Sequence, residues 1–290
     1  MPMAQNGLMH ANCLFIKGQH RRAFEVYREI ALGERNAIAA SNLGYMYHRG
    51  IAVMRDYALA REFYFAASEE DGGAALFNLA LMNLRGQGGA VNFAEARKLM
   101  QRSARRGCAD ARLYLGLAYL LGCMYDPVEI ECVSLIPFYR VIYRDAVVPM
   151  LSGEGYNLLM EDRRFEAIEC DPDEAFFMYQ AAVTEHRDDP YAERQSAAAN
   201  FMVAKFYIEG VGDRYDPRLG YRIMERTAML DGSREAAQFL LDNRAVARVY
   251  KVDTERIEKL LACNYFRFVT GNLGTPRAHR VPLLVPENLQ

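Results

Sequence analysis

A short sequence motif recurs along this chain at a fixed interval of 36 residues. Residues 41–50 read SNLGYMYHRG, residues 77–86 read FNLALMNLRG, residues 113–122 read LYLGLAYLLG, and a fourth copy, MVAKFYIEG, occupies residues 202–210. Self-similarity at such a period is typical of stacked supersecondary units, each of which packs only on its neighbours. The sequence therefore predicts an array of repeats with an extended binding surface, and this favours binding over catalysis.

Each repeat divides into two predicted helices. In the first full copy, one face of the first helix carries a set of small and large apolar residues: Ala39, Leu43, Gly44 and Tyr47. Gly50 is placed to end that helix, and Asp56 to cap the next one. The inner face of the second helix carries a similar set: Ala60, Phe63, Tyr64 and Ala67. Small residues at the crossing predict two helices that approach to about 8 Å.

This pattern resembles the Sel-1-like repeat, a relative of the tetratricopeptide repeat, over residues 37–122 and 196–237. The residues that match it in the first copy are Ala39, Leu43, Gly44, Tyr47, Gly50, Asp56, Ala60, Phe63, Tyr64, Ala66 and Ala67. The resemblance implies an all-α, right-handed superhelical solenoid of antiparallel helix pairs. It also implies adaptor or scaffold work through the concave surface, which in bacteria often serves regulation, secretion or host interaction. Phe63 stands where the family has a signature Trp, and the paired cysteines of one secreted branch are missing.

The repeats predict five segments. Residues 1–36 form a degenerate tetratricopeptide-like repeat, and residues 37–122 hold Sel-1-like repeats, the third of which begins near residue 109. Residues 123–170 are an insertion, expected to form short helices packed on the scaffold, and the repeats resume over residues 171–237 with a polar loop at 186–194. Residues 238–290 contain capping helices and an extended tail, which either packs through its VPLLV run or binds a partner.

Composition limits the class of function. The net charge of −2 and a pI near 6.3 give no global attraction to nucleic acid or anionic lipid. The six cysteines follow neither the repeat nor a metal-ligand spacing, so we expect free thiols in a reducing compartment. We find neither a signal-peptide pattern nor an apolar stretch of the ~18 residues that a membrane span needs. The cytoplasm is the expected location.

The candidate binding residues lie on the face of each first helix that points away from the packing residues. Helical geometry selects nine of them: Asn42, Tyr45, Arg49, Asn78, Leu81, Arg85, Tyr114, Leu117 and Lys205. Tyr and Arg are favoured at protein interfaces because they combine large contact area with directed hydrogen bonds. The predicted partner is a protein or peptide, although Tyr45 and Tyr114 could instead cover neighbouring helices.

The leading hypothesis is a non-catalytic protein-binding scaffold, with no cofactor or metal expected, and the insertion as an added specificity element. A secretion-linked chaperone, a regulator and an immunity-type inhibitor all fit it. The first alternative is an enzyme whose site is built by the insertion: Glu154, Tyr156, Glu161 and Asp162. The second is nucleic-acid binding through basic residues of one repeat: Arg97, Lys98, Arg102, Arg105 and Arg106. The sequence leaves the partner's identity and the oligomeric state open.

Overall fold

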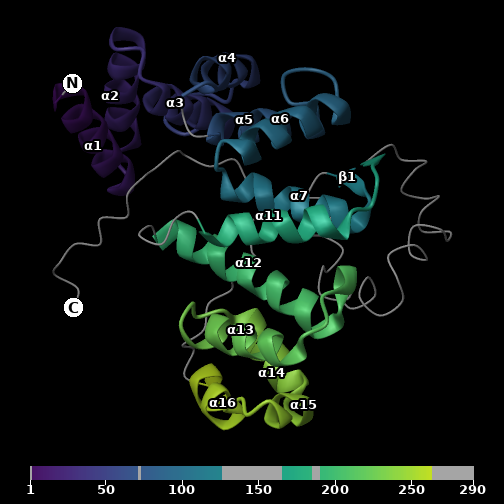
Figure 1. The fold of residues 1–290 in the computed structure, drawn as a ribbon. Coiled ribbons are helices and arrows are strands. Elements are labelled where there is room, and N and C mark those ends of the chain that lie inside the picture. The colour runs from purple at the N-terminus through teal and green to yellow at the C-terminus, as the bar shows by residue number, and fades with distance from the viewer. Residues whose placement is uncertain (1, 71–72, 126–164, 185–189, 263–290) are drawn as a thin grey trace. The chain divides into compact units, whose positions relative to one another are not determined.

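The computed structural model describes residues 2–70, 73–125, 165–184 and 190–262, and these ranges consist of helices together with one short two-stranded sheet (Figure 1). They fall into two compact units, one within residues 1–108 and the other within residues 109–262. The prediction of an all-α fold built from helix pairs is confirmed. Labels below follow Figure 1.

Unit 1 consists of three helix pairs in which each helix packs against the next along the chain. Its helices are α1 (Pro2–Ile16), α2 (His20–Gly33), α3 (Ala37–Arg49), α4 (Tyr57–Ala67), α5 (Ala74–Arg85) and α6 (Phe93–Arg105). The first pair is the degenerate repeat, and its core includes Leu14, Tyr27 and Ile30, all nearly inaccessible to solvent.

Unit 2 opens with α7 (Ala109–Leu121), which packs against α11 (Pro172–Thr184). Its other elements are β1 (Cys123–Tyr125), β2 (Phe165–Ala167), α12 (Pro190–Glu209), a 3-10 turn (Val211–Asp213), α13 (Pro217–Met229), α14 (Arg234–Asp242), α15 (Arg244–Val249) and α16 (Thr254–Ala262). Two corrections follow. Residues 190–194 are helical rather than loop, because Pro190 occupies a helix start where its missing N–H costs nothing. The short helix α15 was not anticipated.

The helix ends predicted at Gly50 and Asp56 are confirmed, and the equivalent residues of other repeats act in the same way. Asp56, Asn92 and Asp216 each cap a helix, and the Asp56 Oδ1 accepts a hydrogen bond from the Leu59 N–H at 3.0 Å. Gly50 and Gly86 end their helices in the left-handed conformation, with φ of 70° and 64°. Local sequence therefore sets the length of each repeat helix.

One backbone hydrogen bond closes each of the four repeats that follow the degenerate first pair. The N–H of the capping residue donates to a carbonyl of the preceding helix nine residues earlier in three repeats: Asp56 to Tyr47 (3.1 Å), Asn92 to Asn83 (2.9 Å) and Asp216 to Tyr207 (2.9 Å). In the remaining repeat the Asp171 N–H donates to the Tyr119 carbonyl at 3.0 Å, across 52 residues. The insertion therefore leaves the closure of its host repeat intact.

The two described ends of the insertion form an antiparallel ribbon. Strands β1 and β2 pair with Cys123 opposite Ala167 and Tyr125 opposite Phe165, and the Ile168 N–H donates to the Gly122 carbonyl at 2.9 Å. The ribbon differs from the expected short helices, because both ends must run side by side to rejoin one repeat. The rest of the insertion, the 263–290 tail and residues 185–189 lie outside the described residues.

The two helices of a repeat meet at a small residue. A Cβ placed on Gly44 of α3 would lie 2.7 Å from the Tyr64 ring of α4, and one on Gly116 of α7 would lie 2.8 Å from the Tyr179 ring of α11. In the other two repeats, Ala80 and Ala204 occupy the glycine position, and Met100 and Met224 occupy the tyrosine position. A glycine on the first helix thus faces a tyrosine on the second, and an alanine occurs with a methionine. Each combination fills the space between the two helices.

We predict that Gly44→Ala lowers the free energy of unfolding by about 1–3 kcal/mol, because the added methyl group meets the face of a buried ring. Adding Tyr64→Met to this variant should recover part of the loss, since it reproduces the pair present in the neighbouring repeat. Urea denaturation followed by circular dichroism measures both values.

The matched control for this prediction is Gly33→Ala, which alters a helical glycine with open space around its Cβ position. It should be neutral or slightly stabilising, because alanine has the higher helix propensity. Equal losses at Gly44 and Gly33 would contradict the packing argument.

We also predict that replacing residues 126–164 by an Asn-Gly turn preserves the fold. Tyr125 and Phe165 face each other in register, so a two-residue turn can join them as a hairpin. Stability should stay equal or rise by up to about 2 kcal/mol, because a shorter loop costs less closure entropy. Thermal melts measure this change. Asp171→Ala, which removes the cap of α11, should instead lower the free energy of unfolding by about 1 kcal/mol. If the Asn-Gly variant no longer unfolds cooperatively, the prediction that the fold is preserved is wrong.

Candidate partner-binding surface

Six of the nine predicted binding residues are buried. Their exposed fractions are 5% or less: Asn42, Asn78, Leu81, Tyr114, Leu117 and Lys205. The expectation that these side chains point away from packing is therefore wrong. The prediction took one packing direction from each helix, whereas α3 contacts α2, α4 and α5. A helix surrounded on three sides retains little open face.

Three of the nine residues keep accessible side chains, all in unit 1. Arg49 of α3 is exposed, and Tyr45 of α3 and Arg85 of α5 are half-buried. Tyr45 partly covers a neighbouring helix, as its ring contacts Phe15 of α1 at 6.3 Å between centroids. The two arginines occupy equivalent positions in adjacent repeats, in the last helical turn, where a cation interacts favourably with the helix dipole.

His48 lies beneath these arginines and was missed by sequence reasoning. It is 4% exposed, and its Nε2 lies 2.8 Å from Oε1 of Gln87, which follows α5. Burial lowers the pKa of His48 to about 4; the Gln87 hydrogen bond opposes that shift, and the charges of Arg85, Arg49 and Arg55 add to it. Its ring is therefore neutral at neutral pH. The positive charge here comes from three arginines close enough to influence one imidazole.

We name this region the α3–α5 surface and define it by Tyr45, Arg49, Arg55 and Arg85. Arg55 comes from the turn before α4, is exposed, and reaches the Tyr57 hydroxyl at 3.4 Å. Sequence reasoning overlooked Arg55 because it lies in a turn, and turns fell outside the helical-face argument. The arrangement offers guanidinium donors beside an aromatic ring, which suits recognition of carboxylates on a partner.

Lys205 has a structural partner in the next turn of its own helix. Its Nζ lies 3.3 Å from the Glu209 carboxylate and 6.0 Å from the ring centroids of Phe201 and Phe239. Burial lowers the pKa of Lys205 and raises that of Glu209 to about 7, with each charge partly opposing the shift of the other. The pair therefore belongs to the interior of unit 2 and not to an open binding surface.

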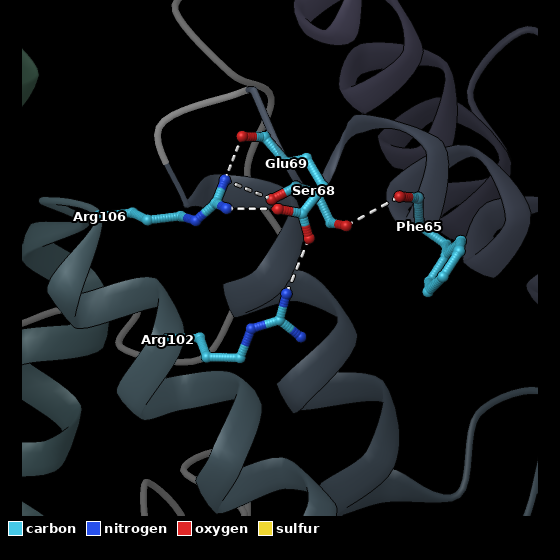
Figure 2. A network of polar contacts seen from close by, with 5 residues as sticks. All are labelled: Phe65, Ser68, Glu69, Arg102 and Arg106. Atoms are coloured by element: carbon cyan, nitrogen blue, oxygen red, sulfur yellow. Dashed lines mark hydrogen bonds and ion pairs between the residues drawn. The ribbon is translucent and has the colours of Figure 1, made fainter.

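Two of the five basic residues in the nucleic-acid hypothesis already share a carboxylate within the protein (Figure 2). Arg102 and Arg106 of α6 both pair with the carboxylate of Glu69, and the Arg102 contact measures 2.8 Å. The Arg106 guanidinium also donates to the carbonyl groups of Ser68 (2.9 Å) and Glu69, at the end of α4. These arginines tie two repeats of unit 1 together, which leaves Arg97, Lys98 and Arg105 for any phosphate.

The residues of the enzyme hypothesis, Glu154, Tyr156, Glu161 and Asp162, lie outside the described residues. Within the described ranges, no cluster of three or more His, Cys, Asp or Glu side chains is placed to hold a metal ion. Among the helices in those same ranges, we find none with the length and apolar character that a membrane span requires.

The repeat geometry agrees with a known family. The family model described as "Sel1 repeat" matches residues 37–71, 73–108 and 197–232, which cover the α3–α4, α5–α6 and α12–α13 pairs. The chain contains Sel1 repeats. The Sel1 repeat is a scaffold for protein–protein interaction, so this coarse class of function follows from the match.

One solved structure supports the fold. This Sel1-repeat chain is similar to the crystal structure of a Sel1 repeat protein from Oxalobacter formigenes, with a TM-score of 0.54 and 22% identity over 80% of this chain and 74% of that one. It also matches c5321, a protective antigen of uropathogenic Escherichia coli with an SLR fold, at 17% identity over 89% of this chain and 60% of that one. The TM-score of that second match is 0.37.

One relative of this chain has a named biological role. The "exopolysaccharide production negative regulator" of Rhizobium meliloti (strain 1021) is 38% identical over 102 residues. The match covers 31% of this chain and 38% of that relative.

We predict that His48 makes these Sel1 repeats less stable in mild acid. Its pKa is about 4 in the folded chain and about 6.5 when unfolded, so its contribution is complete above pH 6.5 and is lost as the pH falls towards 4. From this residue alone, the free energy of unfolding should be about 2 kcal/mol lower at pH 5 than at pH 8. Urea midpoints at both pH values measure it, and His48→Gln should lose this share of the pH dependence. Identical pH profiles for the two proteins would contradict the prediction.

Proposed function

We propose that this protein is a non-catalytic cytoplasmic scaffold that binds a protein partner through the α3–α5 surface. The observation that carries the proposal is the gathering of Arg49, Arg55 and Arg85 around the buried neutral His48, with Arg49 and Arg85 in the last turns of two Sel1 helices and Tyr45 one turn before Arg49. No carboxylate pair or nucleophile accompanies them in that cluster, so the surface suits binding rather than bond breaking.

The chemistry of this surface favours a partner that presents carboxylates beside apolar groups. A guanidinium group binds a carboxylate through two parallel hydrogen bonds, and a half-buried Tyr offers area at low entropic cost. The helices beneath are buried on their other faces, which holds the exposed side chains on a rigid support.

A bacterial regulatory adaptor is the role we favour within this class. The rhizobial relative is a negative regulator, and a scaffold can act in that way by occupying a partner surface. The chain matches 38% of that relative's length, so the regulatory role is carried here as a proposal. A secretion-linked chaperone and an immunity-type inhibitor use the same kind of contact and differ in the identity of the partner.

The insertion gives such a scaffold an added specificity element. Its two described ends form the β1–β2 ribbon. At the foot of this ribbon the Ile168 N–H donates to the Gly122 carbonyl, and the Asp171 N–H, at the start of α11, donates to the Tyr119 carbonyl of α7. A segment held at its base in this way can differ in sequence between scaffolds without altering the repeat that carries it.

Affinity capture from the native host followed by quantitative binding tests this proposal. A partner recovered with the unaltered chain is identified and titrated against the Tyr45→Ala, Arg49→Ala, Arg85→Ala triple variant. We expect at least about a tenfold loss of affinity, since interface anchors contribute more than about 1.4 kcal/mol in total.

The matched control is Arg28→Ala with Arg105→Ala, which removes two exposed arginines from α2 and α6 outside this surface. It should bind as the unaltered chain does. A triple variant with unchanged affinity would remove the α3–α5 surface from consideration.

A further inference from the structure

A hollow of about 310 Å³ lies between α13 and the start of α16 in unit 2. Three arginines line it: Arg222 and Arg226 of α13 and Arg256 of α16. Met229 and Leu230, at the end of α13, supply its apolar part, and Leu230 is 72% exposed. A large exposed apolar side chain ringed by guanidinium groups is unusual for a surface that contacts only water.

The acidic groups in and around this hollow accept backbone hydrogen bonds or pair with arginines outside it. The Glu225 carboxylate accepts the Asp253 N–H at 3.2 Å, and the Asp253 carboxylate accepts the Arg256 N–H at 3.0 Å, where it caps α16. The remaining acidic residues of α16 pair with α15 and its flank: Glu255 with Arg248 at 3.7 Å, and Glu258 with Arg244 at 2.9 Å.

The three arginines of the hollow have no such partners. Within the described residues, the guanidinium groups of Arg222, Arg226 and Arg256 make no hydrogen bond or ion pair with a protein group, and all three side chains are exposed. Arg222 and Arg226 are four residues apart on one helix, so they point from the same face. The hollow therefore presents three exposed guanidinium groups against the two carboxylates of Glu225 and Asp253, an excess of one positive charge, around an apolar patch.

We propose that this hollow binds an acidic, leucine- or methionine-containing segment of a partner protein. The carboxylates of that segment pair with Arg222, Arg226 and Arg256, and its apolar side chain covers Leu230. The charge argument favours a carboxylate-bearing peptide over a nucleic acid, because Glu225 and Asp253 interrupt the basic rim and no aromatic residue lines the hollow for base stacking.

This site is separate from the α3–α5 surface and belongs to the other unit of the chain. It goes beyond the proposed function by assigning a second contact, with a stated chemistry, to the same scaffold. The two surfaces share no residue, so variants of one leave the other intact.

The test is a fluorescence anisotropy titration of the full chain with a short labelled peptide of Asp, Glu and Leu residues. We expect binding that weakens with added salt, because exposed charges carry it. The Arg222→Glu, Arg226→Glu double variant should bind about tenfold or more weakly, and Arg256→Glu should also weaken binding. Arg218→Glu is the matched control, since Arg218 is an exposed arginine of α13 outside the hollow, and it should retain affinity.

Four results would overturn the proposal. They are unchanged affinity in the double variant, equal binding of a peptide with Lys in place of its acidic residues, displacement of the peptide by inorganic phosphate alone, and preference for single-stranded DNA with the same arginine dependence. The triple variant of the α3–α5 surface should bind this peptide normally. If the peptide does not bind, the proposal for the α3–α5 surface is unaffected. If the triple variant of the α3–α5 surface keeps its affinity for the captured partner, the proposal for the hollow is unaffected.

Discussion

The close approach of paired helices at one small residue underlies the rest of the structure. At Gly44 and Gly116 the absence of a side chain lets a buried tyrosine ring lie against the backbone of the partner helix. Once this contact fixes the spacing within a pair, the capping residue falls within reach of the preceding helix and its N–H can close the repeat. Packing between pairs then buries the first helix on several sides, and this decides which side chains remain for a partner.

The helix caps and helix ends of the repeats can be predicted from the sequence alone. Asp56, Asn92 and Asp216 act through bonds that span three residues, and Gly50 through its own backbone conformation, so local sequence is sufficient to place them. Residues 190–194 are polar, which predicts a loop, whereas a proline at a helix start allows a polar first turn. The ribbon at the base of the insertion depends on pairing between residues 40 to 44 positions apart, which carries no local signal.

The candidate site was less predictable than the fold. Asn42 and Asn78 were placed on an open face by helical periodicity, yet burial depends on neighbours from other repeats, which a helical wheel does not contain. Lys205 could have been recognised as a paired residue, since Glu209 follows it by one helical turn. His48 and Arg55 become neighbours of Arg85 only when two repeats stack. The arginine hollow likewise requires α13 and α16 to meet, which the repeat pattern does not specify beyond residue 237.

The bond between Asp171 and Tyr119 has a consequence for how the chain folds. Three repeats close over nine residues, and the third must bring its ends together across 52. The probability that two residues of a flexible chain meet falls with the three-halves power of their separation. This closure is therefore about tenfold less frequent than closure in the other repeats. The third repeat should therefore be the last of the four to close after synthesis, once residues on both sides of the insertion have left the ribosome.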